Sequence, residues 1–338
     1  MFPRSPSSSI LRRSGDFVKS GENGTQLQSQ GPVALLDRAI VRVLPAVPRP
    51  IVRKISDRYI AGTDVADACR VVKGLNGDGK MATIDVLGEE IRSREEALEI
   101  VRAYHDVFEA IEQEHLDSNV SVKLTALGLK LGYELCRGNL ETVVRHAAES
   151  GNFVRIDMED SSCTTDTLRM YGDVREAGLD NLGVVLQAYL RRTLRDIRAL
   201  APYKPNVRLC KGIYVEPELI AFRDFDEVRE NFVRAHSELL RIGSYVGIAT
   251  HDRWLVQEGL RLVAEHGLAR DQYELQMLLG VTEHLGNRLV RDGHRLRIYV
   301  PYGEHWYSYS VRRLQENPKM AGYIASDTVN RLFGANGR

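Results

Sequence analysis

The sequence has few cysteines, no excess of either charge and no long hydrophobic run, and each absence excludes a class of protein. The four cysteines are scattered without a CxxC pair, so neither a disulfide framework nor a zinc site is indicated, and reduced thiols in a reducing compartment are expected. The nine histidines form no HxH or HExxH cluster, and no metal site is predicted. Lysine plus arginine and aspartate plus glutamate both number 46, which gives no electrostatic case for nucleic-acid binding. No apolar run approaches the length of a membrane span.

The chain has 338 residues and is 43% hydrophobic, which suits one large domain or two small ones. Residues 1–32 are rich in serine, glycine and glutamine, and we expect a disordered tail. Arginines in this segment are typical of a mitochondrial presequence, but Asp16 and Glu22 argue against one. The remainder, 33–338, is expected to be a single domain. It opens with an amphipathic helix over 33–53, which should pack on the domain rather than lie on a membrane.

A glycine-rich segment at 74–80 matches the first seven positions of the phosphate-binding GxxxxGK loop. The eighth position should be serine or threonine and is Met81. A helix pattern precedes the glycines and a strand pattern follows them, whereas a phosphate loop needs the opposite order. The segment is therefore interpreted as a helix end, with Gly74 as the cap, followed by a turn.

Beyond residue 80, short apolar runs alternate with helical patterns. Strands are predicted at 82–87, 120–124, 153–158, 182–186, 207–210, 246–249, 273–278 and 297–300. Helices are predicted at 95–111, 140–148, 165–176, 228–241 and 254–265. The strands look continuously apolar, which indicates a parallel sheet covered on both faces, and eight such units over about 260 residues fit a (β/α)8 barrel. The alternative is an open doubly wound sheet, but the GxGxxG motif expected of a dinucleotide-binding version is absent.

Polar residues stand at the carboxyl end of nearly every predicted strand, where a barrel carries its chemistry. Burying so many polar side chains at one rim is costly unless they form a site. At these strand ends, two lysines and an arginine stand with two or three acidic residues, and this composition favours an anionic ligand. After the last strand, Arg312 and Arg313 follow one another on a predicted amphipathic helix, and two such close guanidinium groups suit a carboxylate placed between them.

Seven collinear motifs resemble those of the proline dehydrogenase family. They begin at Ser121-Val-Lys-Leu-Thr-Ala-Leu127 and continue through Ile156-Asp-Met-Glu159, Val185-Leu-Gln-Ala-Tyr-Leu-Arg-Arg192, Val207-Arg-Leu-Cys-Lys-Gly-Ile-Tyr214, Ala249-Thr-His-Asp252, Tyr273-Glu-Leu-Gln-Met-Leu278, and Tyr299-Val-Pro-Tyr-Gly-Glu304 with Val311-Arg-Arg-Leu-Gln-Glu-Asn-Pro318. The resemblance runs from about residue 58 to 318 and is to the short monofunctional bacterial form.

The resemblance implies a distorted (β/α)8 barrel with N-terminal helices and the last helix over the barrel mouth. It implies FAD-dependent oxidation of L-proline to Δ1-pyrroline-5-carboxylate, with electrons passed to a membrane quinone. A separate pyrroline-5-carboxylate dehydrogenase would then be the downstream enzyme. The implied location is cytoplasmic, and peripheral attachment at the inner face of the membrane stays open.

Carried onto this sequence, the resemblance implies that Arg312 and Arg313 clamp the proline carboxylate and that Lys123 also reaches the substrate. Asp157 would organise these cations, and Arg208 would lie beside the reactive nitrogen of the flavin. The apolar substrate contacts would be Leu278 and Tyr299, the latter packed on the pyrrolidine ring. The implied flavin-binding positions are Met158, Gln187, Lys211, Gly212, Ile213, Thr250 and His251. Cys210 and the pair Val215-Glu216 depart from the family pattern, and Cys210 is interpreted as a small hydrophobic residue.

Several of these residues also have purely structural interpretations. Lys123 could belong to a salt bridge inside the barrel, Asp157 could be a structural acceptor, and His251 could be a satisfied core histidine. Competing functions are hydroxyproline dehydrogenase, which would need a small residue in place of Tyr299, and methylenetetrahydrofolate reductase, which would not need the arginine pair. A non-catalytic barrel acting as a binding protein is the third alternative.

Overall fold

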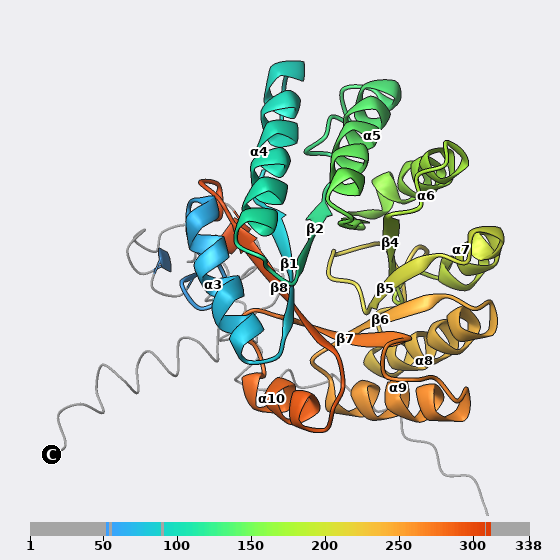
Figure 1. The fold of residues 1–338 in the computed structure, drawn as a ribbon. Helices are drawn as coiled ribbons and strands as arrows, with labels where there is room; N and C mark the ends of the chain where they lie inside the picture. The colour runs from blue at the N-terminus through green and yellow to red at the C-terminus, as the bar shows by residue number, and fades with distance from the viewer. Residues whose placement is uncertain (1–51, 54–55, 89–90, 308, 312–338) are drawn as a thin grey trace, which may run out of the picture.

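The computed structural model describes residues 52–53, 56–88, 91–307 and 309–311, and in this part of the chain eight parallel strands close into a barrel (Figure 1). Each strand pairs with its neighbours in chain order, and β8 pairs with β1 to close the ring. The predicted (β/α)8 barrel is therefore confirmed, and the open sheet is excluded. The predicted tail at 1–32 and nearly all of the predicted helix at 33–53 lie outside the described residues.

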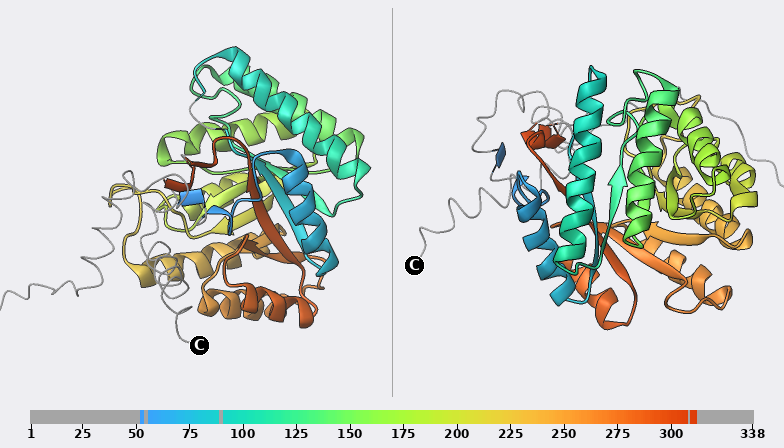
Figure 2. Two further views of the ribbon diagram at one scale, coloured as in Figure 1. Left: turned by 90° about the vertical axis from the view of Figure 1, so that its left-hand side faces the viewer. Right: turned by 45° about the horizontal axis from the view of Figure 1, so that its top comes forward.

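The strands and helices alternate along the chain, and Figure 2 shows the helices on the outside of the barrel. The strands are β1 (Met81–Val86), β2 (Ser118–Val122), β3 (Val154–Ile156), β4 (Leu182–Gln187), β5 (Asn206–Cys210), β6 (Tyr245–Ala249), β7 (Tyr273–Leu278) and β8 (Leu296–Tyr302). The helices are α3 (Val65–Gly77), α4 (Arg94–Gln113), α5 (Tyr133–Glu149), α6 (Ser161–Glu176), α7 (Thr193–Leu200), α8 (Phe225–Arg241), α9 (Arg253–Glu265) and α10 (Glu283–Arg291), with a 3-10 turn, η2 (Ala201–Tyr203). Among these residues no helix has both the length and the apolar composition that crossing a bilayer requires.

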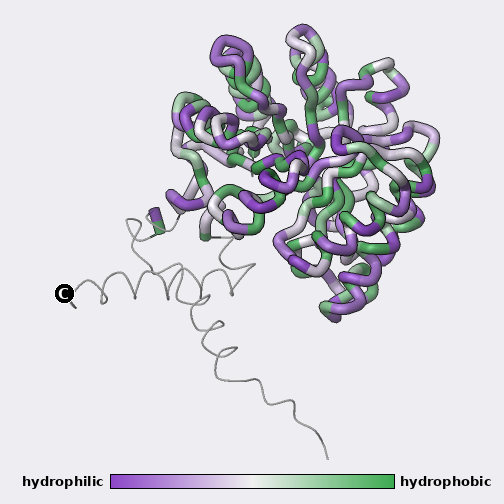
Figure 3. Tube along the Cα trace, turned by 60° about the horizontal axis from the view of Figure 1, so that its bottom comes forward, coloured by the Kyte–Doolittle hydropathy of each residue, from purple (hydrophilic) through white to green (hydrophobic). Residues whose placement is uncertain are grey.

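Helix starts follow the polar residues that the sequence places after the rim loops. Asp160, Asp224 and Asp252 precede α6, α8 and α9, and each side chain accepts a hydrogen bond from a backbone N–H in the first turn of its helix. These caps satisfy donors that a helix leaves unpaired at its start. The helices then return antiparallel to the strands and bury one apolar face against them. Figure 3 shows hydrophobic and hydrophilic residues interspersed along the helices.

Most strands alternate between apolar and polar residues, which corrects the prediction of continuously apolar strands. Residues such as Ile84, Val120 and Leu275 point outward into the core between barrel and helices. The intervening positions point inward, because their side chains bond across strands that are not neighbours in the sheet. Arg155 on β3, for example, donates to the backbone and side-chain oxygens of Asn206 on β5, both at 2.6 Å.

A polar layer fills the lower half of the barrel, where bulky aliphatic side chains are usual. We call this layer the barrel floor, and its members are Asn119, Arg155, Asn206, Glu274 and Arg297. Glycine makes the layer possible at Gly183, because a Cβ there would lie 2.4 Å from Nη1 of Arg155. Burial lowers the pKa of Arg155 to about 9, with the charge of nearby Arg208 acting in the same direction. The floor therefore holds charges close beneath the mouth of the barrel.

The structure corrects one local prediction and adds two helices. The helix predicted to end at Gly74 continues to Gly77, and Leu75 still packs on the core. The helix–strand order around this segment is as predicted, so the phosphate-loop resemblance carries no site. Two helices were not predicted, α7 and α10; they have 8 and 9 residues, which is too short for a clear helical repeat.

Candidate active site at the barrel mouth

One cavity of about 760 Å³ opens at the carboxyl ends of the strands. Every predicted site residue within the described part of the chain lines it, which brings together positions spread over more than 170 residues of sequence. These residues are Lys123, Asp157, Met158, Gln187, Arg208, Lys211, Gly212, Ile213, Thr250, His251, Leu278 and Tyr299. Arg312 and Arg313 lie outside the described residues. A cavity of this size is large enough for a drug-sized ligand.

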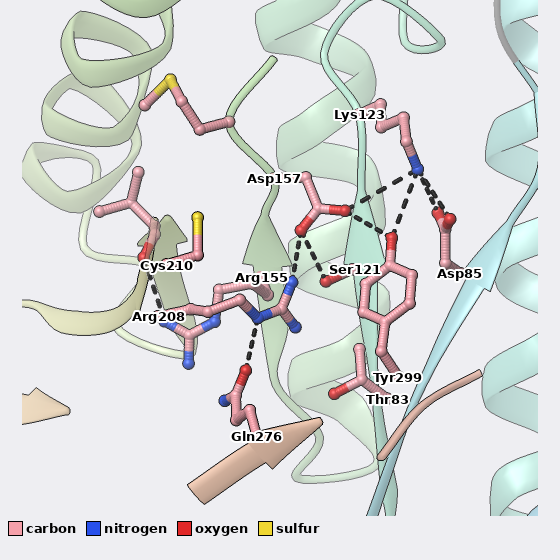
Figure 4. A network of polar contacts seen from close by, with 12 residues as sticks. Thr83, Asp85, Ser121, Lys123, Arg155, Asp157, Arg208, Cys210, Gln276 and Tyr299 are labelled. Carbon is pink, nitrogen blue, oxygen red and sulfur yellow. Dashed lines mark hydrogen bonds and ion pairs between the residues drawn. The ribbon is translucent and has the colours of Figure 1, made fainter. Parts of the chain in front are cut away.

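Asp157 is the centre of a hydrogen-bond network that crosses the cavity floor (Figure 4). Its Oδ1 accepts from Nη1 of Arg208 at 2.6 Å and from Oγ of Ser121 at 3.1 Å. Its Oδ2 accepts from the hydroxyl of Tyr299 at 2.7 Å, and Nζ of Lys123 lies 3.8 Å away. Because both oxygens accept hydrogen bonds, Asp157 holds its neighbours in place.

The principal partner of Lys123 is Asp85, a residue that sequence reasoning did not assign. Nζ of Lys123 donates to both carboxylate oxygens of Asp85, at 2.8 and 2.7 Å, and the Asp85 side chain is fully buried. Burial raises the pKa of Asp85, against the lowering effect of the Lys123 ammonium. The signal that could have found Asp85 is its position at the end of the first predicted strand, level with the other polar strand ends. Lys123 thus forms a salt bridge inside the barrel and also lines the cavity.

Tyr299 presents its ring to the cavity and its hydroxyl to the charged network. Its hydroxyl donates to Asp157, and Nζ of Lys123 lies 3.4 Å from the same oxygen. Cζ of Arg208 lies 5.1 Å from the ring centroid, within the range of a cation–π contact. Burial raises the pKa of Tyr299 well above its usual value, and the negative charge of Asp157 acts in the same direction. The phenol therefore stays protonated and acts as a donor.

The backbone around Gln187 and Gly212 forms a second part of the cavity wall. Nε2 of Gln187 donates to the carbonyl oxygens of Met158 and Glu159, both at 3.3 Å. Its Oε1 is buried without a hydrogen-bond partner among the residues that the structure describes. Gly212 has a φ of +105°, and a Cβ there would lie 2.1 Å from the ring of Tyr189. The glycine is therefore required by the packing of Tyr189, whereas the buried acceptor that lacks a donor is typical of a wall that a ligand completes.

Two basic residues, Lys211 and Arg229, share the carboxylate of Asp252 at the outer end of the cavity. Arg229 was not identified from the sequence, and Asp252 was assigned no role. Arg229 donates to both oxygens of Asp252 at 2.8 Å, and Nζ of Lys211 lies 3.5 Å from Oδ2 of the same carboxylate. Burial opposes ionisation of Asp252, but the bonds from Arg229 and the charge of Lys211 outweigh it and lower the pKa. Two cations sharing one carboxylate leave a positive balance that suits an anionic group such as a phosphate. No sequence signal separates Arg229 from the other arginines of its helix.

His251 bridges two rim loops while lining the cavity. Its Nδ1 lies 2.8 Å from the hydroxyl of Thr282, and its Nε2 accepts from the backbone N–H of Leu278 at 3.2 Å. Because Nε2 is an acceptor, the neutral ring carries its proton on Nδ1. Thr282 has a φ of +50°, a conformation that favours glycine, so this contact is held at some backbone cost. His251 consequently fixes the position of Leu278 at the cavity wall.

Cys210 lines the same cavity, next to Arg208 on β5. Its thiol donates to the carbonyl oxygen of Leu186 at 3.6 Å, and burial raises its pKa to about 11. The group is therefore a protonated thiol at neutral pH. Across the described ranges, no group of three or more histidine, cysteine, aspartate or glutamate residues could hold a metal ion.

Comparisons with known proteins agree on one family. A sequence model described as "Proline dehydrogenase" matches residues 68–326. Proline dehydrogenase 1 of Bacillus subtilis is 39% identical over 274 residues, which are 81% of this chain and 90% of the relative. Proline dehydrogenase of Deinococcus radiodurans is 35% identical over 297 residues, covering 83% and 95% of the two chains.

Solved structures show the same fold. Proline utilization A from Bdellovibrio bacteriovorus, inactivated by N-propargylglycine, superposes with a TM-score of 0.76 and 24% identity. The match covers 85% of this chain and 37% of that one. A mutant of proline utilization A from Bradyrhizobium japonicum superposes with a TM-score of 0.68 and 23% identity, covering 79% and 32%. This chain thus corresponds to about a third of those longer proteins.

Proposed function

The chain belongs to the proline dehydrogenase family, and we propose that it oxidises L-proline to Δ1-pyrroline-5-carboxylate with FAD as the hydride acceptor. Proline oxidation in proline catabolism is the activity of the family, while product, cofactor and electron acceptor are our proposal. The observation that carries it is the cavity in which the Asp157-centred network joins Lys123, Arg208 and Tyr299. A family member that had lost its activity would not need to keep this buried, mutually oriented set of charges.

The cavity fits a flavin dinucleotide on the chemistry of its walls. The buried Oε1 of Gln187 needs a donor, and a flavin ring offers one. Lys211 lies at the basic outer end, where a pyrophosphate would be neutralised. We propose that these residues, with Met158, Ile213, Thr250 and His251, hold FAD. When bound, the flavin would accept the hydride from the ring carbon next to the proline nitrogen.

The residues of this chain would act on the substrate by position and charge. Proline must bind with a neutral amine before it can lose a hydride, and the neighbouring cations Lys123 and Arg208 disfavour the ammonium form. Arg208 would also stabilise negative charge on the reduced cofactor. No side chain has to act as a nucleophile.

The substrate itself would be held by apolar contact and by charge. Tyr299 and Leu278 offer apolar surface to the pyrrolidine ring, and we propose that Arg312 and Arg313 bind the carboxylate. The Tyr299 hydroxyl is already bonded to Asp157, which holds the ring in place, and we propose that this ring leaves no room for a 4-hydroxyl. This geometry supports proline over hydroxyproline as the substrate.

We further propose that electrons pass from the flavin to a membrane quinone and that a separate pyrroline-5-carboxylate dehydrogenase consumes the product. Family membership supports both steps. Attachment to the inner face of the membrane would bring the flavin to its acceptor without a spanning helix.

The test is the colour of the purified protein. We expect an oxidised-flavin absorbance that bleaches anaerobically on addition of L-proline and that returns with a water-soluble quinone. D-proline and trans-4-hydroxyproline serve as matched controls and should bleach the flavin far more slowly. A colourless protein that takes up no added FAD, or a flavin that proline does not reduce, would contradict the proposal.

A further inference from the structure

Glu274 lies on the barrel floor directly beneath the site and takes no part in lining the cavity. It is 2% exposed and stands on β7 two residues before Gln276, so both side chains point inward. Oε1 of Glu274 accepts from Nε2 of Gln276 at 2.6 Å and from Nε of Arg297 at 2.9 Å. Its Oε2 accepts from the hydroxyl of Tyr245 at 3.2 Å. Such a carboxylate is held rigidly from three directions.

The contact with Glu274 determines which way the amide of Gln276 faces. A carboxylate can only accept, so the NH2 group of Gln276 must face Glu274. The amide oxygen then faces the opposite way, where it accepts from Nε of Arg208 at 2.5 Å. The flipped amide would place donor against donor at Arg208 and acceptor against acceptor at Glu274, so chemistry alone excludes it.

Arg208 is consequently held on two of its edges. Gln276 takes Nε and Asp157 takes Nη1, while the guanidinium lines the cavity and its Cζ lies over the ring of Tyr299. Loss of the Gln276 contact would leave Nε without this acceptor and let the guanidinium pivot about its bond to Asp157. A guanidinium that stabilises charge on a reacting group is effective only when it is already aimed at that group.

We propose that Glu274 is a positioning residue for proline oxidation, which fixes Arg208 through the amide of Gln276. The inference rests on the proposed function, because it gives Arg208 the role of stabilising the negative charge that develops on the cofactor. The positioning role requires a hydrogen-bond acceptor at position 274, and the negative charge of Glu274 contributes less to it.

Two substitutions separate the acceptor from the charge. Glu274→Gln loses the charge, but its amide oxygen can still accept from Gln276 and Arg297 while its NH2 faces the hydroxyl of Tyr245. Glu274→Leu loses both charge and acceptor at similar volume. We expect kcat for proline to fall about 10- to 100-fold in Glu274→Leu and to stay within about threefold of wild type in Glu274→Gln. KM should change by less than about threefold in both, because the substrate contacts remain.

The flavin midpoint potential provides a readout that a merely structural role would not move. Both variants lack the same charge, so a difference between them reports the placement of Arg208. We expect the potential of Glu274→Leu to lie below that of Glu274→Gln. Because Leu leaves Arg297 buried without its carboxylate, the double variant Glu274→Leu with Arg297→Met keeps the test open if the single variant does not fold; it should show the same loss of kcat.

Outcomes for the inference and for the proposed function can be told apart. If wild-type protein binds no flavin or is not reduced by proline, the proposed function fails. If wild-type protein is reduced but Glu274→Leu matches Glu274→Gln in kcat and potential, only the positioning role is overturned. Equal losses in both variants would show that Glu274 acts by charge alone, which also overturns it.

Discussion

The buried pair of Lys123 and Asp85 allows a stability prediction to be worked out from the structure. The Asp85 side chain is fully buried and that of Lys123 is 9% exposed, with Nζ bonded to both carboxylate oxygens. Asp85→Asn keeps the volume and one acceptor but removes the charge. The ammonium is then left in the barrel with its Nζ 3.8 Å from Oδ2 of Asp157.

Removing one partner of a buried ion pair typically costs about 3–5 kcal/mol, and we expect Asp85→Asn to lower the free energy of unfolding by about 3 kcal/mol. Urea unfolding followed by tryptophan fluorescence measures this directly. With a slope of about 3 kcal/mol per M for a chain of this size, the midpoint should fall by roughly 1 M.

An exposed carboxylate with two short contacts to one cation provides the control. Asp180 accepts from Nε and Nη2 of Arg175 at 3.0 and 2.9 Å, but its side chain is 81% exposed. Asp180→Asn should cost less than about 1 kcal/mol, because water already screens the pair.

The double variant Asp85→Asn with Lys123→Met should recover about 2 kcal/mol or more relative to Asp85→Asn, since it removes the uncompensated charge. Equal midpoint shifts in Asp85→Asn and Asp180→Asn, or no recovery in the double variant, would refute the reasoning.

Four further predictions concern acid stability and the site. Burial lowers the pKa of His236 from its usual 6.5 to about 4, so the unfolded chain takes up a proton at a higher pH than the folded chain does. The contribution of the neutral histidine to the free energy of unfolding is therefore full above pH 6.5 and falls by about 3 kcal/mol towards pH 4. His236→Leu should flatten this slope in acid-unfolding curves. Arg208→Met should shift the flavin midpoint potential to more negative values in a redox titration; an unchanged potential with a lower melting temperature would leave Arg208 a structural residue. Tyr299→Ser should lower the ratio of kcat/KM for proline over trans-4-hydroxyproline by about 10- to 100-fold, and a wild-type ratio would remove the tyrosine from the ring pocket. Arg312→Ala or Arg313→Ala should each raise KM for proline about tenfold or more while flavin content stays constant, and unchanged saturation curves in both would remove the carboxylate clamp.

The sequence by itself determined the order of the elements and the chemistry of the rim. Apolar spacing located every strand of the barrel and the longer helices, because burial against a sheet imposes a repeat on the chain. Since parallel strands bring their carboxyl ends to one side, the polar residues that follow them could be assigned to one site before any coordinate was known. The collinear motifs added the family and the role expected of each position.

Partnerships inside the barrel were decided only by the tertiary structure. Lys123 could have paired with Asp157, as its motif suggested, but closure of the sheet places Asp85 nearer, with hydrogen bonds of 2.7 and 2.8 Å against a separation of 3.8 Å. Arg155 lies within a strand predicted to be continuously apolar, since a strand buried on both faces is normally apolar throughout and a polar barrel interior breaks that rule. Whether an inward polar residue is left without a hydrogen-bond partner or belongs to a satisfied network depends on side chains from non-neighbouring strands. Those strands meet only when the barrel has closed, and no spacing along the chain encodes their distance.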